Sequence, residues 1–231
     1  MKNEYHHNTR GSTSLIIFVR FPHLGRVKSR LAISLGVETA TGFYRRCVEH
    51  ILGESSKVLG EVQRYVFYSD RSDEGEIRKW LGQRFYCLPQ VAGGLGKRIE
   101  HAFRSVFKEG AQKAVILASD VPDLSARIID DAIKALDRYD IVIGPCYDGG
   151  YYLLGMKKLH RELLRGVSWS TEHVYQQTLY NINRSKLSVY RLPFLADIDT
   201  ERDLRNWIRT ATDSLHPALQ YLKTTGFQTE L

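Results

Sequence analysis

Short apolar runs alternate along most of the chain with longer segments whose apolar residues recur at helical spacing. The runs predict strands at 14–20, 65–69, 85–88, 114–119, 140–145, 151–156 and 187–192. The helical segments lie at about 27–59, 74–81, 98–107, 124–136 and 171–180, with further helices beginning near 200 and 216. This alternation is typical of crossover units, so we expect one α/β domain with three α/β/α layers around a mostly parallel, twisted sheet.

The first 13 residues break this pattern. They are polar, they have no periodicity, and they predict a disordered N-terminal tail (1–13) ahead of a single domain (14–231). A length of 231 residues with 43% hydrophobic and 26% charged residues excludes wholesale disorder and fibrous classes.

The sequence indicates a cytoplasmic protein. Its longest apolar run near the N-terminus, Leu15 to Val19, is too short for a membrane span or a signal-peptide core. Three widely separated cysteines, with no Cys or His at metal-ligand spacing, argue against a structural zinc site and a disulfide framework, and they fit a reducing compartment. Nothing in the sequence indicates an oligomeric state.

A formal net charge of +7 favours an anionic partner. The basic residues are mostly scattered and no aromatic-interleaved basic patch occurs, which disfavours a nucleic-acid role. A small anionic substrate is the better interpretation.

Four cations follow the first expected strand, between Arg20 and Arg30, together with Gly25. A loop of this kind before a helix suits the phosphates of a nucleotide, and Arg20, Gly25, Lys28 and Arg30 are the candidates. The segment is not a Walker A loop, because Val27 rather than Gly precedes Lys28. The alternative is a solvated basic helix start.

Carboxylates follow two later strands. Asp120 comes directly after the run 114–119, with Asp123 three residues on, and Asp199 lies in an acidic cluster, 197–203, where a helix begins. Carboxylate oxygens suit Mg²⁺ or Mn²⁺, so Asp120 is a candidate metal ligand. The alternative is that these residues are turn or helix caps.

Two glycine-rich segments complete the candidate chemistry. In 90–98, Gln90, Gly96 and Arg98 could approach a phosphate or a base, although the G-x-G-x-x-G spacing of dinucleotide sites is missing. The second segment and a later aromatic residue could form an acceptor platform or simply a turn and part of the core: Asp148, Gly149, Gly150, Tyr151 and Trp169.

Six ordered segments between Leu15 and Trp207 together resemble the rSAM/selenodomain-associated transferases, part of which are described as arsenosugar-biosynthesis glycosyltransferases. The segments are 18–31, 90–98, 119–124, 144–155, 169–171 and 197–204. The resemblance implies a GT-A, nucleotide-diphospho-sugar transferase fold, with Asp120 as the metal carboxylate and the first loop at the nucleotide. One departure is Gly94, where that family usually has Asp before Leu-Gly.

The run Lys28 to Leu31 is also similar to nucleotidyltransferases such as the guanylyltransferases of cofactor biosynthesis. In those relatives a second metal carboxylate lies in a segment like 197–204, which implies Asp199 here.

We therefore expect a metal-dependent transferase that glycosylates a small acceptor from a nucleotide sugar, with Asp148 orienting or deprotonating the acceptor. The alternative is a nucleotidyltransferase that uses a nucleoside triphosphate and releases pyrophosphate. A non-catalytic nucleotide or nucleic-acid binding module is a third possibility. The enzyme hypotheses require Lys28 and Asp120 to face one cavity.

Overall fold

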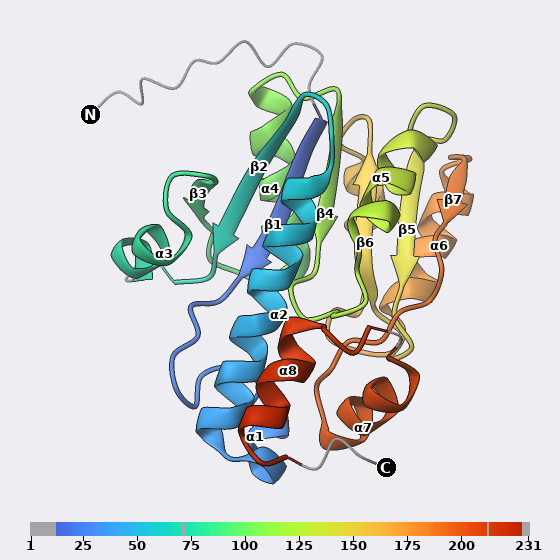
Figure 1. The fold of residues 1–231 in the computed structure, drawn as a ribbon. Helices are drawn as coiled ribbons and strands as arrows, with labels where there is room; N and C mark the ends of the chain where they lie inside the picture. Colours follow the sequence, from blue (N-terminus) through green and yellow to red (C-terminus); the bar gives the residue numbers. More distant parts are fainter. Residues whose placement is uncertain (1–12, 71–72, 212, 228–231) are drawn as a thin grey trace.

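The computed structural model describes residues 13–70, 73–211 and 213–227 and shows a seven-stranded sheet between helical layers (Figure 1). The strands are β1 (Thr13–Val19), β2 (Val62–Tyr68), β3 (Tyr86–Pro89), β4 (Lys113–Leu117), β5 (Ile141–Pro145), β6 (Tyr151–Met156) and β7 (Val189–Arg191). Their order is β3-β2-β1-β4-β6-β5-β7. The expected mostly parallel sheet is confirmed, with β6 antiparallel to both of its neighbours.

Eight α-helices lie in the described part of the chain: α1 (Ser29–Leu35), α2 (Val37–Lys57), α3 (Glu74–Leu81), α4 (Leu95–Lys108), α5 (Ala126–Ala135), α6 (Val174–Arg184), α7 (Glu201–Thr210) and α8 (Pro217–Thr224). A short 3₁₀ helix, η2, spans Arg161–Leu164. The single helical region expected at 27–59 is two helices, because Gly36 has φ 79° and ψ 158°, which is not a helical conformation.

The two faces of the sheet are covered by different helices. Along β1, Leu15 and Ile17 pack with α2, α3 and α5 on one face, whereas Ile16 packs with α4 and α6 on the other. This alternation follows from the two-residue repeat of a strand, and burial on both faces explains why β1 is apolar at successive positions.

A third apolar cluster lies beyond the carboxyl edge of the sheet. It joins α1 and the first half of α2 to α7 and α8, with Phe43 against Trp207 at its centre. Figure 1 shows these C-terminal helices beside α1, below the arrowheads of β1 and β4. The chain's last helices thereby hold the loops that follow the central strands.

The boundaries of the expected domain need one correction. Thr13, assigned to the tail, is the first residue of β1, where it is in register with Val62 and Lys113. The rest of the expected disordered tail lies outside the described residues. Among the helices of the described chain, none combines the length and apolar character needed to cross a membrane.

Candidate active site

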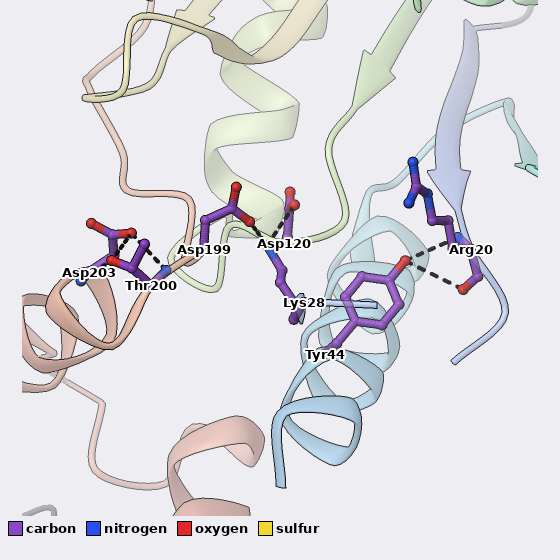
Figure 2. A network of polar contacts seen from close by, with 7 residues as sticks. All are labelled: Arg20, Lys28, Tyr44, Asp120, Asp199, Thr200 and Asp203. Atoms are coloured by element: carbon purple, nitrogen blue, oxygen red, sulfur yellow. Dashed lines mark hydrogen bonds and ion pairs between the residues drawn. The ribbon is translucent and has the colours of Figure 1, made fainter. Parts of the chain in front are cut away.

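Lys28 joins the two carboxylates that the sequence marked as metal ligands. Its Nζ lies 2.9 Å from Oδ2 of Asp120 and 2.6 Å from Oδ1 of Asp199 (Figure 2). Asp120 follows β4, Asp199 precedes α7, and Lys28 is the N-cap of α1, so three distant segments meet at one ammonium group. The expectation that Lys28 and Asp120 face one cavity is confirmed, and the two side chains are in direct contact.

The charges of this triad differ in exposure. The Lys28 side chain is 5% exposed, whereas those of Asp120 and Asp199 are 33% and 46% exposed. Burial alone would lower the pKa of Lys28, but the charges of Asp120 and then Asp199 outweigh it and raise the pKa above its ordinary value. Lys28 is therefore a charged, buried group whose partners remain open to a ligand.

Local structure fixes each carboxylate. The backbone N–H of Ile198, a buried residue, donates to the Asp120 carbonyl at 3.2 Å, which holds the two acidic segments together. Thr200 then begins α7 in a capping box with Asp203, as Figure 2 shows. Thr200, rather than Asp199, is thus the helix cap, and Asp199 is left at the rim of the site.

Tyr44 on α2 holds the end of β1. Its hydroxyl accepts a hydrogen bond from the backbone N–H of Arg20 at 3.0 Å and donates to the Arg20 carbonyl at 3.4 Å (Figure 2). Burial, the largest effect, raises the pKa of Tyr44, so the phenol stays neutral. Tyr44 was not among the residues predicted for the site, because a helical Tyr among apolar neighbours is typical of the core.

A cavity of about 470 Å³ lies over the triad and the carboxyl ends of β1 and β4. Its lining brings together many of the sequence candidates: Arg20, Lys28, Arg30, Gln90, Arg98, Asp120, Tyr151 and Asp199. Gly25, Gly96, Asp148, Gly149, Gly150 and Trp169 are not part of that lining. The cavity therefore combines two carboxylates with four cations, as an anionic ligand with a metal would require.

Gln90 and Arg98 line the cavity and contact one another. The Gln90 amide donates to the Phe67 carbonyl at 2.8 Å, and Arg98 donates from Nε to the Gly93 carbonyl at 2.8 Å and from Nη1 to Gln90 Oε1 at 3.4 Å. Gly94, the departure from the resembled family, is the N-cap of α4, and a Cβ there would meet open space.

The glycines outside the cavity lining have roles in packing or in backbone conformation. A Cβ on Gly96 would lie 2.4 Å from Nε1 of Trp169, so this glycine lets the indole pack on the first turn of α4. Trp169 in turn meets Tyr151 edge to face at 6.4 Å. Gly25 has φ +72° in the turn before α1.

The turn after β5 carries Asp148, whose Oδ1 accepts the Gly150 N–H at 2.8 Å. Gly149 has φ +90°, and a Cβ there would lie 2.1 Å from the Glu172 carbonyl oxygen. The candidate acceptor segment is thus a tight turn, and side-chain substitution at Gly149 would disrupt it.

Asp197 is a second residue of the site that was not predicted from the sequence. One ligand atom each from Cys146, Asp148 and Asp197 lie within 4.8 Å of one another, so these groups could hold a metal ion. Burial, followed by the charges of Asp148, Asp120 and Asp199, raises the pKa of Asp197 to about 7. The acidic cluster 197–203 was the available signal, but burial and the approach of carboxylates from other loops are tertiary properties.

Asp123, in contrast, has a structural partner. Its Oδ1 accepts a hydrogen bond from Nε1 of Trp207 on α7 at 2.8 Å. The second carboxylate of the Asp120–Asp123 segment therefore anchors the C-terminal helices to the loop after β4.

With this geometry established, comparison with known proteins places the chain. A family model described as "Uncharacterized protein conserved in bacteria (DUF2064)" matches residues 55–171, which is half of the chain. The chain belongs to the DUF2064 family. The description names no activity, so the narrower resemblance to the rSAM/selenodomain-associated transferases stays a prediction.

Two proteins similar to this DUF2064 chain are named for nucleotide chemistry. A 2-phospho-L-lactate guanylyltransferase from Methanocaldococcus sp. (strain FS406-22) is 28% identical over 138 residues, covering 59% of this chain and 58% of that protein. A crystal structure of a "putative nucleotide-diphospho-sugar transferase" from Desulfovibrio desulfuricans G20 has a TM-score of 0.87 and 29% identity, covering 93% of this chain and 95% of the other.

A more distant neighbour shows the fold alone. It is the 4-diphosphocytidyl-2C-methyl-D-erythritol synthase of Anaerococcus prevotii DSM 20548, with a TM-score of 0.60 and 15% identity, covering 91% of this chain and 96% of the other. The expected nucleotide-diphospho-sugar transferase-like α/β fold is confirmed.

Proposed function

We propose that this protein is a metal-dependent nucleotidyltransferase that takes a nucleoside triphosphate and releases pyrophosphate. The carrying observation is that Lys28, Asp120 and Asp199 meet on the wall of a cavity that three arginines also line. The similarity to a guanylyltransferase supports nucleotidyl transfer over glycosyl transfer, which was the first expectation from the sequence.

The donor set suits Mg²⁺ or Mn²⁺. Asp120 and Asp199 present hard carboxylate oxygens that already share one cation, Lys28. In our proposal these two residues hold the metal, which supplies positive charge against the phosphates when bound. The arginines at 20, 30 and 98 bind phosphate oxygens and orient the triphosphate.

The proposed transfer needs an acceptor oxygen in line with the α-phosphorus. That oxygen forms the new P–O bond, the bridging bond to the β-phosphate breaks, and its electron pair leaves with pyrophosphate. In our proposal Asp148 or Asp197, whose carboxylates lie close together, receives the proton where the acceptor is a hydroxyl. We propose the turn at Gly149 and Gly150, together with Tyr151 and Trp169, as the acceptor side.

Transfer of a sugar is the second candidate, because the D. desulfuricans neighbour covers nearly the whole chain and is named for nucleotide sugars. The same cations would then hold a diphosphate.

We also propose a cytoplasmic location. A nucleotide-dependent reaction and three unpaired cysteines fit a reducing compartment of this kind.

Product identification separates these functions. The protein is incubated with Mg²⁺ or Mn²⁺, small phosphorylated or hydroxylated acceptors, and either nucleoside triphosphates or nucleotide sugars. We expect acceptor-dependent pyrophosphate; release of a nucleoside diphosphate from a nucleotide sugar would favour glycosyl transfer. Salt-sensitive oligonucleotide binding without any nucleotide-induced thermal stabilisation would favour a non-catalytic module and contradict both enzymes.

A further inference from the structure

Lys28 occupies the position that the proposed function gives to a metal. Its ammonium group contacts one oxygen of Asp120 and one of Asp199, and 5% of its side chain is exposed. In Figure 2 the ammonium lies between the two carboxylates. A lysine dedicated to phosphate would instead leave its charge free toward the cavity.

The backbone of Lys28 is also unusual. Its φ of 49° and ψ of 44° are left-handed, a backbone conformation that residues other than Gly, Asn and Asp rarely adopt. Among non-glycine residues in the described ranges, it shares a positive φ with Ser170 and Lys186. This backbone directs the side chain inward to the carboxylates, rather than along the outer surface of α1.

One ammonium and one divalent cation compete for the same oxygens. Both are positive, so a metal bound to Asp120 and Asp199 would repel Lys28 at short range in a partly buried site. Because Lys28 is tethered beside its partners, it competes at a high effective concentration. A phosphate group entering between Arg20 and Arg30 would offer the displaced ammonium a new anion.

We propose that Lys28 is an internal counter-cation that holds the Asp120–Asp199 pair in the absence of ligand and transfers to the phosphates when a metal nucleotide binds. This inference rests on the proposed function. It makes metal and nucleotide binding mutually dependent, because each removes an obstacle to the other.

The test compares Mn²⁺ affinity of the full chain and its Lys28→Met variant, measured by the electron paramagnetic resonance of free Mn²⁺. Without nucleotide, we expect Lys28→Met to bind Mn²⁺ roughly tenfold more tightly than the unaltered protein. Adding a nucleoside triphosphate tightens Mn²⁺ binding to the unaltered protein but much less to the variant. Lys186→Met is the matched control, since Lys186 is exposed and also has a left-handed backbone.

Equal or weaker Mn²⁺ binding by Lys28→Met overturns the inference. If neither protein binds Mn²⁺ even with each nucleoside triphosphate, the proposed function fails as well. If both proteins bind Mn²⁺ only with nucleotide, and Lys28→Met binds it no more tightly than the unaltered protein, the inference is overturned but the proposed function stands.

A second measurement needs no substitution at Lys28, in case the unpaired carboxylates prevent folding. Lysines of the unaltered protein are acetylated with and without saturating Mn²⁺, and the extent of modification at each lysine is read by mass spectrometry. We expect Mn²⁺ to increase acetylation of Lys28 and to leave Lys186 unchanged. Equal acetylation of Lys28 in both conditions overturns the inference.

Discussion

At the scale of single residues, Tyr44 shows how a core side chain can serve the site. It is 6% exposed, and its hydroxyl contacts both backbone polar atoms of Arg20, the first residue after β1. These contacts fix the direction in which the Arg20 side chain leaves the strand. Tyr44 is therefore a positioning residue in this account, and its effect is expected on nucleotide binding.

We expect Tyr44→Phe to raise the KM for nucleotide several-fold with a smaller effect on kcat, because Arg20 loses its anchor. The lost hydrogen bonds should also cost about 1–2 kcal/mol of unfolding free energy. Steady-state kinetics and denaturant unfolding measure the two effects, with the exposed Tyr180→Phe as the control. An unchanged KM would show that Tyr44 is structural alone.

Asp197 gives a pH-dependent prediction. Its pKa is raised from 3.8 to about 7, so the folded protein favours the neutral carboxyl, and the ionised group lowers stability as pH rises through this window. Asp197→Asn should therefore raise the Tm in metal-free buffer at about pH 8 and change it little at about pH 4. Thermal unfolding at both pH values tests this, and an equal Tm difference at the two would contradict it.

At the scale of elements, the start of α8 is attached to the loop that carries Asp120. His216 donates from Nε2 to the Pro122 carbonyl at 3.1 Å, while its Nδ1 accepts the Ala218 N–H at 3.2 Å. The His50 ring from α2 lies 4.2 Å from that of His216. Burial, the largest effect, lowers the pKa of both imidazoles and favours their neutral forms, so we expect the attachment to depend on pH.

Burial and then the neighbouring His216 lower the pKa of His50 from 6.5 to about 4. A lowered histidine pKa means that stability present above pH 6.5 is lost as pH falls from 6.5 toward 4. As the pH is lowered from about 7 to about 5, the Tm of His50→Gln should therefore fall less than the Tm of the unaltered protein. Parallel Tm curves for the two proteins would contradict this.

Elements with clear local patterns were predictable from the sequence. α3 and β6 have the expected bounds, because each depends on nearby residues. The antiparallel direction of β6 was not predictable, since it depends on which strands the chain pairs. For the same reason Asp197 was missed: its raised pKa arises first from burial and then from Asp148 and Asp120, which are distant in sequence.

At the scale of the whole molecule, the site depends on the adjacency of β1 and β4. These parallel neighbours end at one edge, so the loop of Lys28 and the carboxylate of Asp120 come together. The C-terminal segment then adds Asp199 through the apolar cluster around Trp207. The enzyme hypotheses drawn from the sequence required Lys28 and Asp120 to face one cavity, and both residues line the same cavity at this edge.

The most direct test of the central claim is equilibrium binding of nucleoside triphosphates to the unaltered protein and to Asp120→Asn, with Mn²⁺ and with EDTA. We expect the unaltered protein to bind a triphosphate more tightly with Mn²⁺ than with EDTA. We expect Asp120→Asn to keep its fold but to bind the triphosphate in Mn²⁺ roughly tenfold or more weakly than the unaltered protein. Asp130→Asn, on α5 and with a side chain that is 39% exposed, serves as the matched control and should behave like the unaltered protein. Equal triphosphate affinity of Asp120→Asn and the unaltered protein in Mn²⁺ would contradict the account.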